Sequence, residues 1–167
     1  MSPAEQEKIE LEHQAARLFM RHWERNQGVP IRHIWHNRPD KPDVSCFLDG
    51  ERLDLEIAHL YGSEVEAMDI LGRDLSATTQ RELTALNASD TSGRLLRALN
   101  RILAIKAEKT YNSERVWLVI RNANPHWSRP EIEALQHHIE VPAGHPFEQI
   151  WMVADMHADS GIVQLFP

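Results

Sequence analysis

The sequence predicts an α/β (α+β) fold in which a mixed central sheet is flanked by helices. Stretches with apolar residues at helical spacing alternate with apolar runs of strand length. One such run, residues 116–120, has no polar member, which indicates a strand buried on both faces. The predicted helix that precedes this run indicates a crossover connection, and therefore a sheet with parallel and antiparallel strands.

The size and charge of the chain set the first limits on function. Its 167 residues fit a single domain spanning residues 1–167. The hydrophobic share of 42% can supply one core, and the charged share of 26% is ordinary for a soluble protein. The formal net charge of −7 argues against tight nonspecific binding to nucleic acid. A local basic patch or a metal-bridged contact stays compatible with it.

The cysteine count and the N-terminal residues indicate a cytoplasmic protein. Cys46 is the one cysteine, which excludes an internal disulfide and a multi-cysteine zinc site and fits a reducing compartment. Residues 1–13 are too acidic and polar for a signal peptide. No apolar run is long enough to cross a membrane, so we expect no membrane association.

The first element is a helix with clear start and stop signals. Ser2, Pro3 and Glu5 give a capping box with proline in the first turn, and Gly28 and Pro30 end the helix. Its apolar residues recur at helical spacing: Leu11, Ala15, Leu18, Phe19 and Trp23.

A short strand and a hairpin follow this helix. Residues 31–35 are predicted as the short strand, and residues 44–48 and 52–58 as the two hairpin strands. The connecting Asp49-Gly50 is the strongest short hairpin signal.

Three helices, one undecided stretch and three strands complete the prediction. Ser63 and Glu66 open a helix to about residue 71, while residues 73–90 leave helix and loop open. Ser92 is predicted to cap a helix over residues 93–109. The later predicted elements are a strand at 115–121, a helix from Ser128 to about 138, and closing strands at 149–155 and 161–167.

The hairpin carries acids on one of its faces. A two-residue turn fixes the register, and alternation then separates a core face from a polar face. The core face is Val44, Cys46, Leu48, Leu53, Leu55 and Ile57. The polar face is Asp43, Ser45, Phe47, Arg52, Asp54, Glu56 and Ala58. In this register Asp43 lies directly opposite Glu56, with Cβ atoms about 5 Å apart.

The opposed acids of the hairpin predict a metal site. Two like charges at that distance repel, and a divalent cation between Asp43 and Glu56 would remove the repulsion. Mg²⁺ is usually held by one or two carboxylates together with substrate phosphate. The alternative is a solvated polar face, which Arg52 and Asp54 on the same face favour.

Pro42-Asp43, followed by Glu56 on the next strand, resembles the signature of the PD-(D/E)xK nuclease superfamily. The order of helix, strand meander, helix and buried strand agrees with its restriction-endonuclease-like core over roughly residues 5–121. The resemblance implies that Asp43 and Glu56 bind Mg²⁺ or Mn²⁺ during hydrolysis of DNA or RNA phosphodiester bonds. It also implies a supporting glutamate from the first helix, for which Glu12 is the better candidate and Glu10 the weaker.

The chain departs from this superfamily at one residue. The signature has a lysine two residues after the glutamate, where this chain has Ala58. Lys106 is the candidate replacement because it falls on the apolar face of the predicted helix at 93–109, and Lys109 is the second candidate. The alternative for Lys106 is a side chain that extends from the helix end into solvent.

Three interpretations of the function follow. The first is a Mg²⁺-dependent nuclease in which Asp43, Glu56, Lys106 and Glu12 are catalytic. The second is a catalytically inactive nuclease-fold domain that binds a protein or nucleic-acid partner, which Ala58 favours. The third is a domain whose acids are all solvated. Because many proteins of this fold act as dimers or in larger systems, a homodimer or a protein partner is also compatible with the resemblance.

Overall fold

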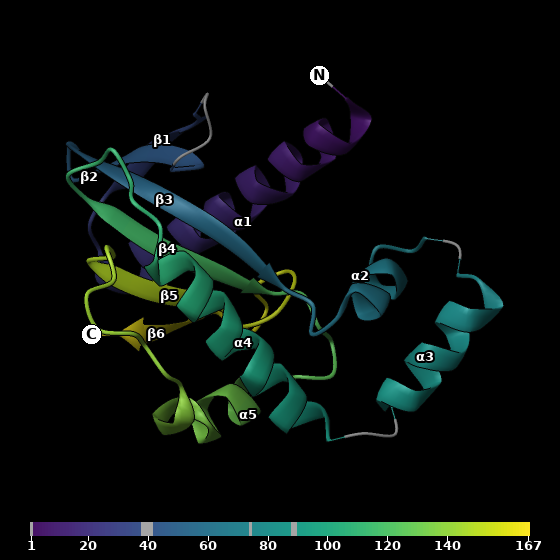
Figure 1. The fold of residues 1–167 in the computed structure, drawn as a ribbon. Helices are drawn as coiled ribbons and strands as arrows, with labels where there is room; N and C mark the ends of the chain where they lie inside the picture. Colours follow the sequence, from purple (N-terminus) through teal and green to yellow (C-terminus); the bar gives the residue numbers. More distant parts are fainter. Residues whose placement is uncertain (1, 38–41, 74, 88–89) are drawn as a thin grey trace.

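One mixed sheet forms the centre of the protein. The computed structural model describes residues 2–37, 42–73, 75–87 and 90–167. Within them the strands form a single six-stranded sheet in chain order (Figure 1). These strands are β1 (Ile31–His36), β2 (Val44–Leu48), β3 (Glu51–Leu60), β4 (Val116–Asn122), β5 (Gln149–Val153) and β6 (Ile162–Phe166). β3, β4 and β5 are parallel and the other neighbours are antiparallel, so the predicted mixed sheet is confirmed.

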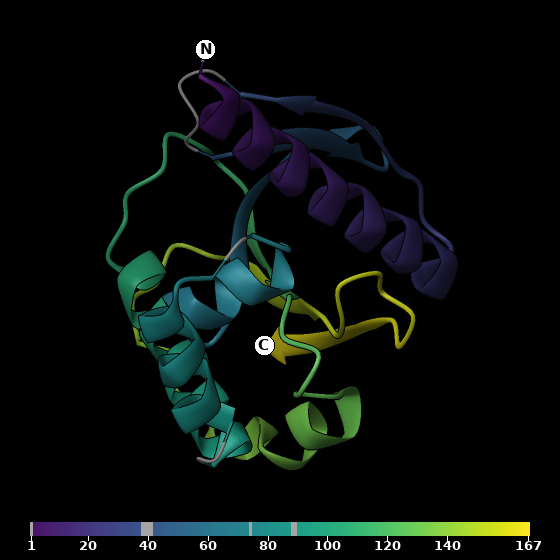
Figure 2. The same ribbon diagram turned by 90° about the vertical axis from the view of Figure 1, so that its right-hand side faces the viewer.

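Helices cover both faces of this sheet. They are α1 (Pro3–Gln27), α2 (Glu64–Ile70), α3 (Ala77–Asn87), α4 (Thr91–Ala107), α5 (Arg129–Ala134) and the 3₁₀ turn η1 (Gln136–His138). Figures 1 and 2 show α1 on one face and α4 on the other. α4 lies in the long connection between the parallel strands β3 and β4, as the crossover prediction requires.

Each face of the sheet has its own apolar core. Trp117 of β4 packs on the α1 side, where the Phe19 ring meets it edge-on at 6.1 Å between centroids. Its neighbour Leu118 packs on the α4 side with Leu99. All residues of β4 are buried, which confirms the interpretation of the apolar run as a strand covered on both faces.

The hairpin has the predicted turn and register. Asp49 and Gly50 both have positive φ, 50° and 83°, as a type I′ turn requires. Val44 pairs with Leu55, and every predicted pair from there to the turn is present. The predicted core face is buried throughout.

α1 has the predicted ends but a rotated buried face. Ser2 and Glu5 form the capping box, and Gly28 ends the helix with φ of 69°. Leu11 and Leu18, predicted in the core, are only half-buried. The buried residues are Glu12, Ala15, Ala16, Phe19, Met20 and Trp23. A carboxylate therefore lies on the face that packs against the sheet.

The start of α4 differs from the prediction. Asp90, not Ser92, is the N-cap, and its side chain accepts a hydrogen bond of 3.2 Å from the Gly93 N–H. The Ser92 hydroxyl instead donates to Glu131 at 2.5 Å, so it ties α4 to α5. The predicted helix to residue 138 is also interrupted, because α5 ends at Ala134 and η1 follows. The undecided residues 73–90 include α3.

Replacing the residue that caps α4 should lower the stability of the protein modestly. Asp90→Ala is expected to lower the free energy of unfolding by about 1 kcal/mol, because the Gly93 N–H loses its acceptor. Urea denaturation measures this loss. Asp90→Asn keeps a cap oxygen and should stay within about 0.5 kcal/mol of the wild type. Equal losses in both variants would contradict the assignment of Asp90 as the cap.

Candidate functional site

The candidate site lies where the ladder between β2 and β3 ends. β2 begins at Val44, whereas β3 continues beyond the partner of Val44 as far as Leu60 and pairs there with β4. α1 approaches this edge from one face of the sheet and the end of α4 from the other (Figures 1 and 2). Side chains from both faces can therefore meet beside the half of β3 that β2 does not pair with.

Asp43 and Glu56 are held together, but not as the predicted ladder pair. Asp43 precedes β2, and its carboxyl Oδ2 accepts a hydrogen bond of 2.8 Å from the backbone N–H of Ile57. The backbone N–H of Asp43 in turn donates to Glu56 Oε1 at 3.3 Å. The ladder ends at Val44 and Leu55, one residue short of the predicted Asp43–Glu56 pair, because the chain bends before β2. The two acids nevertheless lie side by side.

Glu56 is the centre of the site. Its Oε2 accepts hydrogen bonds from the Lys106 ammonium group at 3.0 Å and from the Tyr111 hydroxyl at 2.9 Å. Glu56 is 2% exposed, and the Lys106 side chain is 18% exposed. The contact of Lys106 with the carboxylate contradicts the alternative in which this lysine extends into solvent.

Glu12 and His36 complete the cluster from the α1 side. Glu12, on the buried face of α1, is 4% exposed, and the Asp43 carboxyl is hydrogen-bonded to it. His36, at the end of β1, places Nε2 at 3.8 Å from Glu12 Oε1. That oxygen and both ring nitrogens of His36 are buried without a hydrogen-bond partner. Unpartnered buried polar atoms are uncommon in folded proteins, and they often mark a functional position.

Protonation differs between the two central acids. Burial raises the pKa of Asp43 to about 9, and hydrogen bonds with Glu56 and Glu12 add to the shift. Burial also acts to raise the pKa of Glu56, but hydrogen bonds from Asp43, Lys106 and Tyr111 outweigh it and hold that pKa below its usual value. Asp43 therefore carries a proton at neutral pH, while Glu56 is ionised and paired with Lys106.

The interpretation in which the hairpin acids are solvated is wrong. Asp43, Asp54 and Glu56 are all at most 5% exposed. Asp54 accepts hydrogen bonds from the Ser45 hydroxyl at 2.5 Å and from Arg52 at 3.0 Å. The predicted polar face is thus a buried network, and the arginine that seemed to indicate solvation is the partner of Asp54.

The structure brings together all four predicted site residues: Glu12, Asp43, Glu56 and Lys106. The weaker alternative Glu10 is exposed. Lys109, the second lysine candidate, donates its backbone N–H to the Lys106 carbonyl at the helix end. Ala58 is half-buried against the core on the α4 side.

Sequence reasoning missed Tyr111 and His36. Tyr111 lies in the irregular segment after α4, where no periodicity fixes the direction of a side chain. His36 is the last residue of β1, beyond the predicted strand, and an irregularity between Arg32 and Trp35 shifts its register relative to β2. The only available signal was the closeness of Tyr111 to Lys106 in the chain.

The donor atoms at the site suit a hard divalent cation. In the part of the chain that the structure describes, no group of three or more His, Cys, Asp and Glu side chains is already arranged to hold a metal ion. The carboxylates of Asp43, Glu56 and Glu12 are nevertheless the ligand type that Mg²⁺ and Mn²⁺ prefer. A cation here would have to replace the proton of Asp43 and compete with Lys106 for Glu56.

Two clefts adjoin this cluster from opposite sides. One, of about 530 Å³, is lined by Tyr111 together with Arg52 and Asp54. The other, of about 280 Å³, is lined by Glu12 together with Ala58. A substrate phosphate could therefore approach the cluster past Tyr111 or past Glu12.

In the described residues, no helix combines the length and apolar character needed to span a membrane.

Comparisons with known proteins identify no relative of the chain. The chain has no significant match among protein-family models, curated proteins or solved structures.

Proposed function

We propose that this protein is a metal-dependent nuclease that hydrolyses phosphodiester bonds of DNA or RNA. One observation carries the proposal. Glu12, Asp43, Glu56 and Lys106 come from α1, the residue before β2, β3 and α4, and they meet in one buried cluster. Burying three acids costs free energy, because each must be neutralised or paired, and such clusters are typical of functional sites.

The cluster has the groups that phosphodiester hydrolysis needs. Asp43 and Glu56 would hold Mg²⁺ or Mn²⁺, with Glu12 in support. When bound, such a cation polarises the scissile phosphate and lowers the pKa of a water molecule. Tyr111 and the backbone N–H of Asp43 orient the Glu56 carboxylate, which fixes its position for binding.

Lys106 would supply the cationic group that Ala58 cannot. Its ammonium group lies 3.0 Å from Glu56 Oε2, at the place where the negative charge of the attacked phosphate would develop. A cation fixed at that place stabilises the transition state more than the ground state. Its position on α4 means that the amine reaches the site from a helix.

The order of elements also supports the proposal. The chain has a first helix, a three-stranded meander that carries Asp43 and Glu56, a connection that contains α2, α3 and α4, and a buried strand parallel to β3. With α4 as the crossover helix and α2 and α3 as additions, this order agrees with what the resemblance to the PD-(D/E)xK superfamily implies.

A cleavage assay tests the proposed activity. The purified chain is incubated with end-labelled single-stranded DNA, RNA and duplex DNA in Mg²⁺, in Mn²⁺ or in EDTA. We expect cleavage that requires the metal and falls at least 100-fold in Glu56→Gln, because the variant loses a carboxylate ligand. Glu10→Gln, which changes an exposed acid of the same helix as Glu12, is the matched control and should cleave normally. Cleavage that survives both Asp43→Ala and Glu56→Ala would refute the mechanism.

A second candidate is an inactive domain of the same architecture that binds a protein or nucleic-acid partner. The observation in its favour is the set of bonds that Lys106 and Tyr111 make to Glu56, because they satisfy the carboxylate with no metal. Isothermal titration with Mn²⁺ separates the two candidates. The nuclease predicts binding that Glu56→Ala abolishes, and the inactive domain predicts no binding by either protein.

A further inference from the structure

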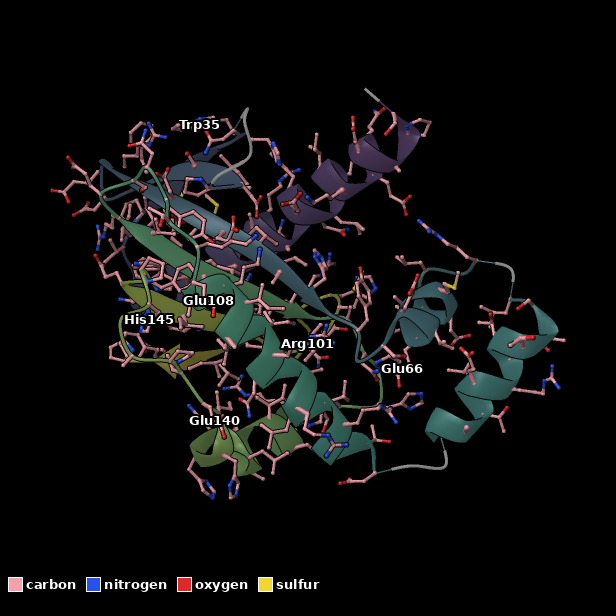
Figure 3. The ribbon with its side chains drawn as sticks, viewed as in Figure 1. Trp35, Glu66, Arg101, Glu108, Glu140 and His145 are labelled. Atoms are coloured by element: carbon pink, nitrogen blue, oxygen red, sulfur yellow. The ribbon has the colours of Figure 1, made fainter. Side chains whose placement is uncertain are left out.

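A row of arginines follows α4 away from the cluster. Arg94, Arg97 and Arg101 are spaced three and four residues apart, so they share one side of the helix. Arg94 is largely buried and pairs with Glu66 of α2. Arg97 and Arg101 are exposed, and neither makes an ion pair with an acid among the described residues. Figure 3 shows Arg101 in the middle of α4, with Glu66 on the neighbouring α2.

The arginine row borders a cleft with aromatic residues on its opposite side. This cleft, of about 460 Å³, lies between α4 and the end of β3 and includes His59 and Tyr61. Their rings are nearly parallel, with an interplanar angle of 14° and centroids 6.0 Å apart. Glu64, at the start of α2, is the acid that lines it. Cations on one wall and half-buried rings on the other give the two kinds of contact that nucleotides make.

The cleft adjoins the candidate site. His59 and Tyr61 also line the neighbouring cleft that contains Glu12 and Ala58. Lys106 lies on the same helix as the arginines, five residues after Arg101, or about 7.5 Å along the axis. A strand that leaves the arginine cleft past His59 and Tyr61 would therefore reach the cleft beside Glu12.

We infer that this cleft binds a single-stranded polynucleotide, with phosphates against Arg97 and Arg101 and an unpaired base against Tyr61 and His59. The inference rests on the proposed function only for which bond of the polynucleotide is cut. The binding itself needs no metal. Bases in a duplex are stacked on each other, so they cannot offer a face to the rings of a cleft. The cleft volume of about 460 Å³ is large enough to hold a molecule the size of a nucleotide.

Fluorescence anisotropy in EDTA tests the inference without cleavage. The probes are a labelled single-stranded DNA of mixed sequence, the RNA of the same sequence and the matching DNA duplex. We expect the single strands to bind at least tenfold more tightly than the duplex. Arg97→Gln/Arg101→Gln should weaken single-strand binding at least tenfold and make the salt slope shallower by about 1.4, or 0.7 for each lost phosphate contact.

A matched variant controls for net charge. Arg25→Gln/Arg81→Gln removes two exposed arginines from α1 and α3 and should bind within twofold of the wild type. Tyr61→Leu, which retains bulk but loses the aromatic face, should weaken single-strand binding about fivefold or more with an unchanged salt slope. Circular dichroism checks that all variants are folded.

Three outcomes would overturn the inference: preference for the duplex, equal losses in the two arginine pairs, or no single-strand binding by the wild type. These outcomes are distinct from failure of the proposed nuclease. Glu56→Gln should retain single-strand binding in EDTA, because the cleft does not include Glu56. A chain that binds single strands but cuts nothing would support the cleft and refute the nuclease.

Discussion

Replacing Lys106 with methionine is expected to lower the free energy of unfolding of the metal-free protein by about 3 kcal/mol. The substitution keeps an apolar stem but leaves the charge of Glu56 buried without its cation. Urea denaturation in EDTA at pH 7 measures the loss. Lys106→Met/Glu56→Gln removes both charges and should recover most of it. A loss below 1 kcal/mol in the single variant would contradict a buried ion pair.

The same two variants separate a structural lysine from a catalytic one. Without Lys106 no ammonium group competes for Glu56, so saturating Mn²⁺ should raise the melting temperature of Lys106→Met more than that of the wild type. The double variant should not respond. If Lys106 also acts on the phosphate, Lys106→Met binds the metal but cleaves at least 100-fold more slowly. Normal cleavage by this variant would limit the lysine to stability.

Asp43 is expected to make the metal-free protein lose stability as the pH rises. Its carboxyl has a pKa of about 9 in the folded protein, compared with 3.8 when unperturbed. Between these values the folded state binds the extra proton, so the free energy of unfolding falls by up to about 1.4 kcal/mol per pH unit. Glu56, whose pKa is lowered, contributes in the opposite sense and only at acid pH.

Asp43→Asn tests this slope directly. The amide oxygen can still accept the Ile57 hydrogen bond and does not titrate. In EDTA the variant should be more stable than the wild type at pH 8 and should change little from pH 6 to pH 9. Asp49→Asn, in the exposed turn, is the control and should keep the wild-type slope. A slope that persists in Asp43→Asn would contradict the assignment of the proton to Asp43.

Local signals predicted most of the fold. The turn at Asp49-Gly50 set the whole register of β2 and β3, because a two-residue turn leaves no alternative pairing. The start of α4 was predicted wrongly because Asp90 and Ser92 are both good caps. The choice depended on Glu131, which is distant in sequence and takes the Ser92 hydroxyl.

The candidate site was predicted less completely than the fold. Asp43 and Glu56 could be paired from the hairpin alone, and Lys106 from its place on an apolar helix face. Glu12 was predicted only through the resemblance, as the better of two glutamates, because the apolar spacing of the helix does not show that its buried face is rotated toward Glu12. Tyr111 and His36 reach the cluster through tertiary packing and an irregular strand end, which sequence periodicity does not describe.

The crossover between β3 and β4 also has a consequence for folding. Glu56 and Lys106 are joined only when the chain closes a long loop, because α4 and Tyr111 lie within that connection. The ladder between β2 and β3, by contrast, joins residues that are close in the chain, so it can form within microseconds. Contacts between residues that are distant in sequence form late, because closing the loop between them costs conformational entropy. The protein should therefore gain its candidate site in the same step that completes the sheet, so a partly folded chain would have the hairpin but not the cluster.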